Sequence, residues 1–524
     1  MFKSLRFAAA LLAPRVGAAA RTRIAAAAAR TGTALLALLG LLGPLSLAVA
    51  VAPAAAADFK ASPEMAIELR HAQWFDGDKL QRGSLYIEDG VFTAQRPKKV
   101  NRMMELRGQT LVPPLAEGHN HNLQSAWGLE RFGQDYLRDG VFYAAMLCAD
   151  PAAIDPIRSR IDQPDAPDVL FATACITSSD GQPLAMLQSA QPPMTLDQIV
   201  DKAVLVMDIP ADVARKWPLV RERKTDLVKV IMSYHDRPEL REQPDQRGKL
   251  GVTPEVMAEV VRLAHQDGLR VVAHVESARD FEAAVRAGVD FIAELPGYFP
   301  QHGEAPETHE IPAEVAVMAA ERKIGVITAT VATQLFQLSP ELQARIEDVQ
   351  KRNLARLKEA GVRLLVGSDL FTGNALSEVH HLDALGVLDR PTLLRMATQD
   401  TPRALFPKRK LGCFAPGCEA SFLVLNANPL EDLSALDKPL LRIKQGRVLT
   451  QLDDVAATAG NDNTLAEGEA AHRASAKSSR SSKSSKSGKT AKSGKAAAAG
   501  SKSSTAAKTS KSTTSSKAKK SSGE

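Results

Sequence analysis

At 524 residues, 44% of them hydrophobic, the chain can bury a large core and has the composition of a globular protein. Its formal net charge of +6 is unevenly spread: residues 1–57 carry +6 and residues 473–524 carry +13, which leaves −13 on residues 58–472. An acidic body excludes a nucleic-acid-binding core, whose basic residues would gather on the folded domain, so we predict no nucleic-acid partner.

The first 57 residues have the pattern of an export signal. A basic, alanine-rich leader precedes an apolar run at 33–51, and small residues (PAAAA) stand before Asp58. This order predicts cleavage near Ala57 and a periplasmic protein. The alternative is an uncleaved membrane anchor, because the apolar run approaches spanning length. Pro44 and Pro53 favour cleavage.

Two flanking regions have alternating apolar and polar residues separated by turn signals, which is typical of short strands. They cover residues 58–113 and 411–455, and we predict that together they form one small β-sandwich domain. The chain has four cysteines, too few for a disulfide scaffold. Cys413 and Cys418 flank the sequence FAPG, and either a cross-linked hairpin or two free thiols fits this spacing.

Between the flanks, apolar strand-like runs alternate with helical patterns. Thr253 and Gly268 mark the start and end of one predicted helix, and Ser277 and Gly288 mark another. Fully apolar strands alternating with helices indicate a parallel sheet covered by helices. We predict the α/β class and a (β/α)8 TIM barrel over residues 114–410, with a doubly wound open sheet as the alternative. The eight strand-like runs are 110–118, 141–149, 168–175, 226–232, 269–275, 290–295, 323–330 and 362–369.

From residue 456 to 524 the chain is rich in serine, lysine and alanine and has no aromatic residue. Such a segment cannot bury enough apolar surface to fold, so we predict a disordered cationic tail. Its two possible roles are a weak contact with anionic envelope polymers and simple solubilisation.

Metal-ligating side chains stand at the ends of five predicted strands. His119 and His121 follow the first strand, and side chains at i and i+2 of a strand point to the same side. Lys229 lies inside an apolar strand, where a charged amine is costly unless it is neutralised or coordinated. Because the strands of a barrel end at one face, we predict a joint metal centre. Its members are His119, His121, Lys229, His274, Glu294 and Asp369.

In this order, the motifs resemble the amidohydrolase superfamily, in particular its exported imidazolonepropionase- and prolidase-like members. The resemblance covers residues 65–455 and includes GQTLVPPLAEGHNH, AHVES, AGVDFIAELPGY, LLVGSDLFTG and MATQDTPRALF. It implies that His119 and His121 bind the more buried of one or two divalent ions, expected to be zinc. Lys229, carboxylated by carbon dioxide, would bridge two ions as a carbamate, and His274 would bind the second ion.

The resemblance also implies an activity. Asp369 would act as general base and then general acid while a metal-bound hydroxide hydrolyses a C–N bond. The expected small-molecule substrate is an amide or cyclic amide, such as a dipeptide or an N-acyl amino acid.

Two positions depart from the family pattern. Glu294 stands where such proteins usually have histidine, and Glu117 stands where they usually have aspartate. Three arrangements are open at position 294: the carboxylate ligates the ion, the second ion is weak or missing, or His302 or His309 takes its place. The alternative function is therefore a degenerate barrel that acts as a non-catalytic binding protein.

Overall fold

The computed structural model describes residues 59–451 except 191 and 300–302. The predicted export signal and the predicted tail lie outside the described residues. Within them, no helix combines the length and the hydropathy needed to cross a membrane.

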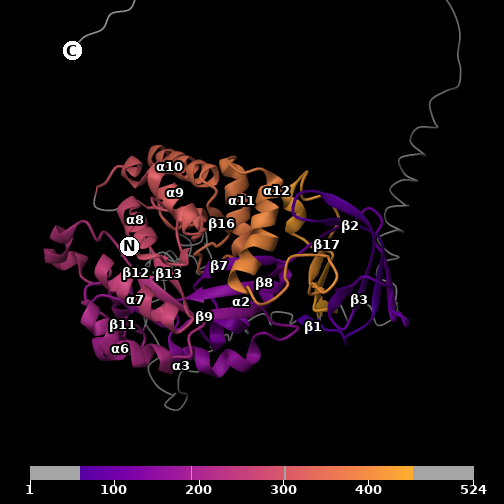
Figure 1. Ribbon diagram of the computed structural model, residues 1–524, viewed down its shortest axis with the longest axis horizontal. Coiled ribbons are helices and arrows are strands. Elements are labelled where there is room, and N and C mark those ends of the chain that lie inside the picture. The colour runs from indigo at the N-terminus through magenta and orange to yellow at the C-terminus, as the bar shows by residue number, and fades with distance from the viewer. Residues whose placement is uncertain (1–58, 191, 300–302, 452–524) are drawn as a thin grey trace, which may run out of the picture. The chain divides into compact units, whose positions relative to one another are not determined.

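Strands from both flanks share one nine-stranded sheet (Figure 1). The two sets of strands meet where β17 pairs antiparallel with β6, with Leu423 opposite Val112. The strands of this sheet are β1 (Phe59–Ala61), β2 (Ile67–Phe75), β3 (Leu80–Glu88), β4 (Val91–Thr93), β5 (Arg102–Glu105), β6 (Thr110–Val112), β17 (Phe422–Leu425), β18 (Leu441–Lys444) and β19 (Arg447–Gln451).

The central region contains two parallel sheets. One holds β7 (Leu115–Asn120), β8 (Val141–Leu147) and β9 (Asp168–Ala172). The other has the order β11 (Leu205–Val206), β10 (Ala174–Thr177), β12 (Leu227–Ile231), β13 (Arg270–His274), β14 (Phe291–Ile292), β15 (Gly325–Ile327) and β16 (Arg363–Leu365). All the predicted strand regions contain strands, so the predicted α/β class is confirmed. The arrangement is consistent with a fold that contains a TIM barrel.

The two parallel sheets adjoin each other at both ends. Thr173 alone separates β9 from β10 along the chain. On the other side, the Gly118 N–H donates to the carbonyl of Val366 (2.9 Å), and the Asp369 N–H donates to that of His119 (2.8 Å). A Cβ atom on Gly118 would lie 2.8 Å from the Val366 oxygen, so glycine is what permits this close approach.

The structure divides two predicted strands. The first run, 110–118, crosses Pro113 and Pro114, and it contributes β6 to the flank sheet and β7 to a parallel sheet. Proline has no N–H for a ladder hydrogen bond, which explains a break at this point. The run 168–175 is divided at Thr173, whose hydroxyl donates to the carbonyl of Arg223.

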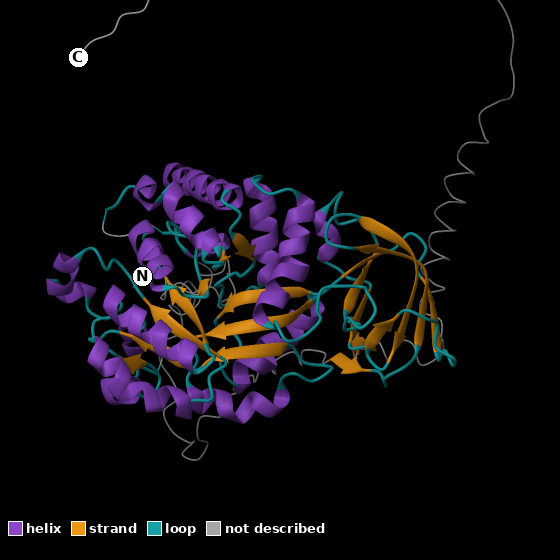
Figure 2. Ribbon diagram, viewed as in Figure 1, coloured by secondary structure: helices purple, strands orange, loops and turns teal. Residues whose placement is uncertain are grey.

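Helices lie around the parallel strands (Figure 2). The two predicted capped helices are confirmed: the Thr253 and Ser277 hydroxyls accept from backbone N–H groups of α7 and α8, and Gly288 ends α8 with a φ of 81°. The α-helices are α2 (Ala126–Arg138), α3 (Pro151–Ile154), α4 (Leu184–Gln188), α5 (Leu196–Ile199), α6 (Pro210–Glu222), α7 (Pro254–Gln266), α8 (Ala278–Ala287), α9 (Ala313–Glu321), α10 (Pro340–Glu359), α11 (Ala375–Leu385), α12 (Arg390–Arg395) and α13 (Thr401–Leu405). Shorter 3-10 helices are η2 (Asp155–Arg160), η3 (Pro238–Glu242), η4 (Pro244–Gln246), η5 (Pro306–His309), η6 (Thr330–Leu335) and η8 (Leu433–Leu436), and η7 (Met396–Asp400) is a π-helix.

A buried ion network connects the flank sheet to the parallel strands. Lys444 of β18 is fully buried, and its Nζ donates to Asp168 Oδ1 of β9 (2.6 Å) and to the carbonyl of Gln163 (2.7 Å). Arg409 donates to Asp168 Oδ2 (2.7 Å) and to Glu419 Oε2 (2.6 Å). Every charge of this network has an oppositely charged partner, as burial requires.

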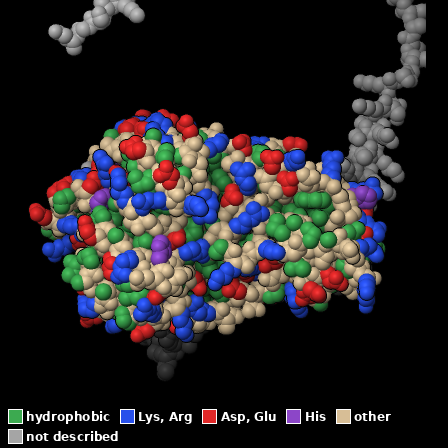
Figure 3. All heavy atoms as spheres, viewed as in Figure 1, with side chains coloured by type: hydrophobic (Ala, Val, Ile, Leu, Met, Phe, Trp, Pro, Cys, Tyr) green, Lys and Arg blue, Asp and Glu red, His purple; other side chains and the backbone are tan. Residues whose placement is uncertain are grey.

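On the face of the molecule shown in Figure 3, basic and acidic side chains are interspersed and do not separate into patches. The absence of a nucleic-acid partner stays a prediction.

Candidate metal centre

Three ligand atoms converge at the carboxyl ends of β7 and β16. The Nε2 atoms of His119 and His121 lie 3.1 Å apart, and Asp369 Oδ1 lies 3.4 Å from the first and 3.2 Å from the second. His119 Nδ1 is 3.1 Å from the carbonyl of Ala293, to which it donates. This contact leaves the Nε2 lone pair of His119 directed at the cluster, because a neutral imidazole carries one N–H.

This donor set fits a divalent ion. Ligand atoms of a tetrahedral zinc ion lie about 3.3 Å apart, since each is about 2.0–2.1 Å from the metal. Burial lowers the pKa of His119 to about 4, so the ring is neutral at pH 7, as ligation requires. Burial raises the pKa of Asp369, but its contacts with His119 and His121 outweigh burial and lower that pKa below its usual value, so the carboxyl is ionised.

A second set of nitrogen atoms surrounds Glu294, which follows β14. Its Oε1 lies 2.9 Å from His274 Nδ1, 3.3 Å from Lys229 Nζ and 3.4 Å from His119 Nδ1. Its Oε2 accepts from the Val275 N–H (3.2 Å). Burial alone would raise the pKa of Glu294, yet His274 and Lys229 hold it well below the usual value.

The structure therefore brings all six predicted ligand residues together. Lys229 is 2% exposed, and in its unmodified form its charge is balanced by Glu294. Burial lowers the pKa of His274, but Glu294 and Glu276 outweigh it and raise that pKa to about 10. His309 is buried beside Glu304 (3.3 Å) and does not line the cavity above these residues, and His302 lies outside the described residues.

The Amidohydrolase family profile matches residues 206–449, a range that contains Lys229, His274, Glu294 and Asp369. This matched part of the chain belongs to the amidohydrolase superfamily. The predicted enzyme class, a hydrolase that acts on carbon–nitrogen bonds, follows from this membership. No curated protein sequence matches the chain significantly.

Solved structures show the same fold. A Xaa-Pro dipeptidase with bound methionine is 18% identical with a TM-score of 0.58, and the match covers 74% of this chain and all of the dipeptidase chain. The ochratoxinase of A. niger (18%, TM-score 0.59) is matched over 74% of this chain and 96% of its own. A putative prolidase from Bifidobacterium longum (20%, TM-score 0.58) is matched over 75% and 98%.

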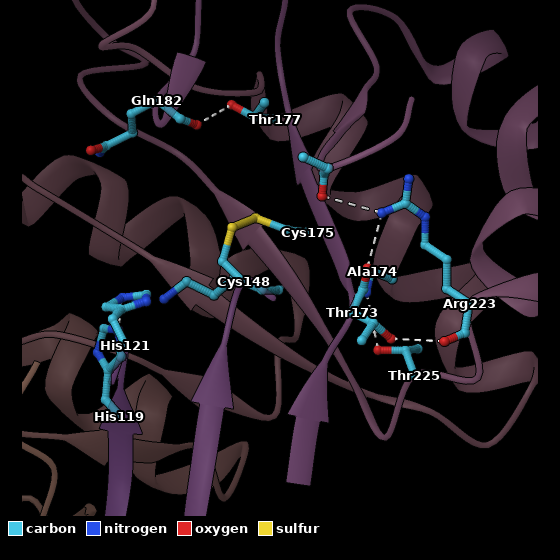
Figure 4. Close-up of a disulfide and its surroundings, with 12 residues drawn as sticks. His119, His121, Cys148, Thr173, Ala174, Cys175, Thr177, Gln182, Arg223 and Thr225 are labelled. Carbon is cyan, nitrogen blue, oxygen red and sulfur yellow. Dashed lines mark hydrogen bonds between the residues drawn. A yellow bond between two sulfur atoms is a disulfide. The ribbon is translucent and has the colours of Figure 1, made fainter. Parts of the chain in front are cut away.

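A cavity of about 440 Å³ opens above the candidate ligands, and all six line it. The Cys148–Cys175 disulfide joins the residue that follows β8 to the second residue of β10, and Cys148 lines the cavity. Figure 4 shows this disulfide beside the strand end that carries His119 and His121. Cys413 and Cys418 form a second disulfide, so of the two alternatives left open by the sequence, the cross-linked one is observed.

Three polar residues near His274 were not among the predicted site residues. Glu276 Oε1 lies 3.1 Å from His274 Nε2 and accepts from the Tyr298 hydroxyl (2.9 Å) and from Gln182 Nε2 (3.2 Å). A carboxylate on the far nitrogen of a metal-ligating histidine fixes the ring and its tautomer. The spacing of Glu276, two residues beyond His274, was the available clue.

Glu117 holds two of the strand ends that carry the candidate ligands. It is fully buried and accepts from the N–H groups of His119 (2.9 Å) and Ser368 (2.8 Å), and from the Ser368 hydroxyl (2.7 Å). Burial raises the pKa of Glu117 to about 8 despite these bonds. This carboxyl ties the ends of β7 and β16 together and so fixes the spacing between His119 and Asp369.

Proposed function

We propose that this protein is a metal-dependent amidohydrolase that hydrolyses the C–N bond of a small amide or cyclic amide. The observation that carries the proposal is the convergence of His119 Nε2, His121 Nε2 and Asp369 Oδ1 within 3.1–3.4 Å of one another at the floor of the cavity. We further propose that the two parallel sheets form a single (β/α)8 barrel, whose carboxyl-end face carries the active site.

His119, His121 and Asp369 are the proposed ligands of one divalent ion, which we expect to be zinc because two imidazoles and a carboxylate suit it. When bound, such an ion lowers the pKa of a water molecule and polarises a substrate carbonyl. Asp369 is ionised and borders the cavity, so it accepts the proton of the attacking water. As the C–N bond breaks, Asp369 returns that proton to the leaving nitrogen, and its carboxylate is regenerated.

Lys229, His274 and Glu294 form the proposed second ion site, with Lys229 carboxylated by carbon dioxide. In the unmodified state the Lys229 ammonium neutralises Glu294 (3.3 Å). A carbamate would place a second negative charge against Glu294 in a buried site, which requires a cation between them. We therefore expect carbon dioxide and the second ion to bind together. Zinc content measured with and without bicarbonate, with the intact mass, tests this: one ion in both conditions would refute the carbamate.

We also propose that the protein works in the periplasm. Both disulfides use all of the chain's cysteines, and disulfides persist in oxidising compartments. Fractionation of cells that express the full chain, with the amino-terminal residue of the mature protein determined, tests export and cleavage near Ala57. Recovery of the uncleaved chain with the membrane would favour the anchor.

The decisive experiment is hydrolysis by zinc-reconstituted protein. We expect the wild type to cleave members of a panel of neutral anilides, dipeptides and lactams, and His119→Ala to lose both zinc and activity. If the wild type binds zinc but cleaves nothing, while Glu294→His cleaves the same panel, the alternative of a non-catalytic binding protein is correct.

A further inference from the structure

The walls of the cavity are apolar above the polar floor. One wall comes from residues 183–189 and 194–204, which follow β10, and it includes Met186, Leu187 and Met194. Leu335 and Phe336 at the end of η6, which follows β15, form part of another. In the proposed barrel β10 and β15 belong to the third and seventh strand positions, which are opposite each other, so apolar side chains face the substrate from two sides.

Apolar surface continues to the rim. Leu335 is 39% exposed and Phe371 is 46% exposed, although both are large hydrophobic residues. The Phe371 ring stacks on His121, with centroids 5.8 Å apart and planes inclined by 25°. Phe336 stacks on Phe299 with centroids 3.9 Å apart. Exposed apolar groups that lead into a cavity mark a binding surface for an apolar ligand.

The walls of the cavity carry few charged side chains. Among the described residues that line the cavity there is no arginine, the side chain whose fork binds carboxylates. Lys229 is paired with Glu294 at the floor. The remaining wall charges, Asp150 and Lys249, are one of each sign.

We propose that the substrate is an uncharged amide with an aliphatic or aromatic group, and that this group, not a carboxylate, provides recognition. The inference rests on the proposed function, because its first test measures hydrolysis. It narrows the range of proposed substrates, because a dipeptide or an N-acyl amino acid carries a free carboxylate. Each methylene removed from water contributes about fourfold to kcat/KM.

The test uses p-nitroanilides that share one leaving group and differ in the acyl chain. From acetyl to hexanoyl p-nitroanilide we expect kcat/KM of the zinc-loaded full chain to rise by about 200-fold. Glutaryl p-nitroanilide resembles the hexanoyl compound in length but ends in a carboxylate, and we expect it to be at least about 100-fold poorer. Equal or better cleavage of the glutaryl compound overturns the inference and leaves the proposed function standing.

Binding separates the two claims. The dissociation constants of the hexanoyl and glutaryl compounds are measured by calorimetry with the same zinc-loaded protein. If neither compound is cleaved but the hexanoyl compound binds at least about 100-fold more tightly, the proposed function fails and the inference holds. If the two bind equally, the inference fails.

A substitution at the rim locates the effect. Leu335→Lys places a cation beside the cavity at an already exposed position, so we expect it to shift the preference toward the glutaryl compound by at least about tenfold. Val317→Lys is the matched control, because Val317 on α9 is 48% exposed and does not line the cavity. An identical shift in both variants, or none in Leu335→Lys, would overturn the assignment of this wall.

Discussion

The Nδ1 atom of His274 lies 2.9 Å from Oε1 of Glu294, and both side chains are buried. The same carboxylate oxygen lies 3.3 Å from Lys229 Nζ. The Glu294 carboxylate thus contacts nitrogen atoms from two neighbouring strands. When no metal ion is bound, its negative charge is what offsets the positive charge of Lys229.

Glu294→Gln should therefore be strongly destabilising. The change leaves the buried Lys229 ammonium without an opposite charge, a loss that costs about 3–5 kcal/mol of unfolding free energy. Urea unfolding in the presence of a chelator measures it. Glu307→Gln is the control, because Glu307 pairs with Arg345 at an exposed site and its removal should have little effect. Similar curves for the two variants would show that Lys229 is satisfied in some other way.

Zinc should stabilise the wild type through His121. A ligand that binds the folded state alone adds about 2.7 kcal/mol at 100 times its dissociation constant. We expect zinc to raise the melting temperature of the wild type and to have less than half of that effect on His121→Ala. His380→Ala is the control, since His380 pairs with Asp437 and does not line the cavity. An equal response of the three proteins would refute the zinc ligand set.

Much of the candidate site could be predicted because parallel strands all end at one edge. His119, Lys229, His274 and Asp369 each lie in or just after an apolar run, and a shared edge brings such positions together. Glu294 also follows a strand, but its pairing with Lys229 and His274 depends on side-chain directions that periodicity does not specify.

Contacts between segments that are distant in the chain could not be predicted from the sequence. Cys148 and Cys175 are 27 residues apart, and their disulfide can be inferred only once the end of β8 is known to lie beside the start of β10. The pair of Lys444 and Asp168 is separated by 276 residues, so no local pattern indicates it. The two prolines after Val112 can be seen in the sequence. The sequence does not indicate that the chain passes there from one sheet to another.

Lys444→Met should weaken the junction between the flank sheet and the parallel strands. It removes a buried cation that donates to Asp168 and to the carbonyl of Gln163, and we expect a loss of about 3 kcal/mol. Arg409 still balances Asp168, which keeps the loss at the lower end of the range for broken buried pairs. Lys438→Met, at an exposed position, is the control. Urea unfolding of both variants decides, and equal stability would show that the network contributes nothing.

The two disulfides should differ in their contribution. Chain-entropy arithmetic for a 27-residue loop gives about 3.5 kcal/mol for Cys148–Cys175, and about 2 kcal/mol for the five-residue loop of Cys413–Cys418. Double alanine variants of each pair, unfolded in urea without reductant, measure these values. The opposite ranking would mean that packing around the bridges outweighs loop closure.

Stability should also depend on pH through His235. Burial lowers the pKa of His235, but its hydrogen bond to Asp280 (2.8 Å) and the charges of Asp280, Asp236 and Glu255 raise it above the usual value. A raised histidine pKa stabilises the fold below the unfolded value of about 6.5, and this contribution is lost as the pH rises through the folded value.

The partner of His235 stays ionised over this range. Burial opposes it, but contacts with His235 lower the pKa of Asp280. His235→Gln should therefore reduce the unfolding free energy by about 1 kcal/mol near pH 5.5 and by less near pH 9. Urea unfolding of metal-free protein at both pH values measures the difference. A loss that is equal at the two pH values, or larger at the higher one, would show that the protonated form of His235 is not what the fold stabilises.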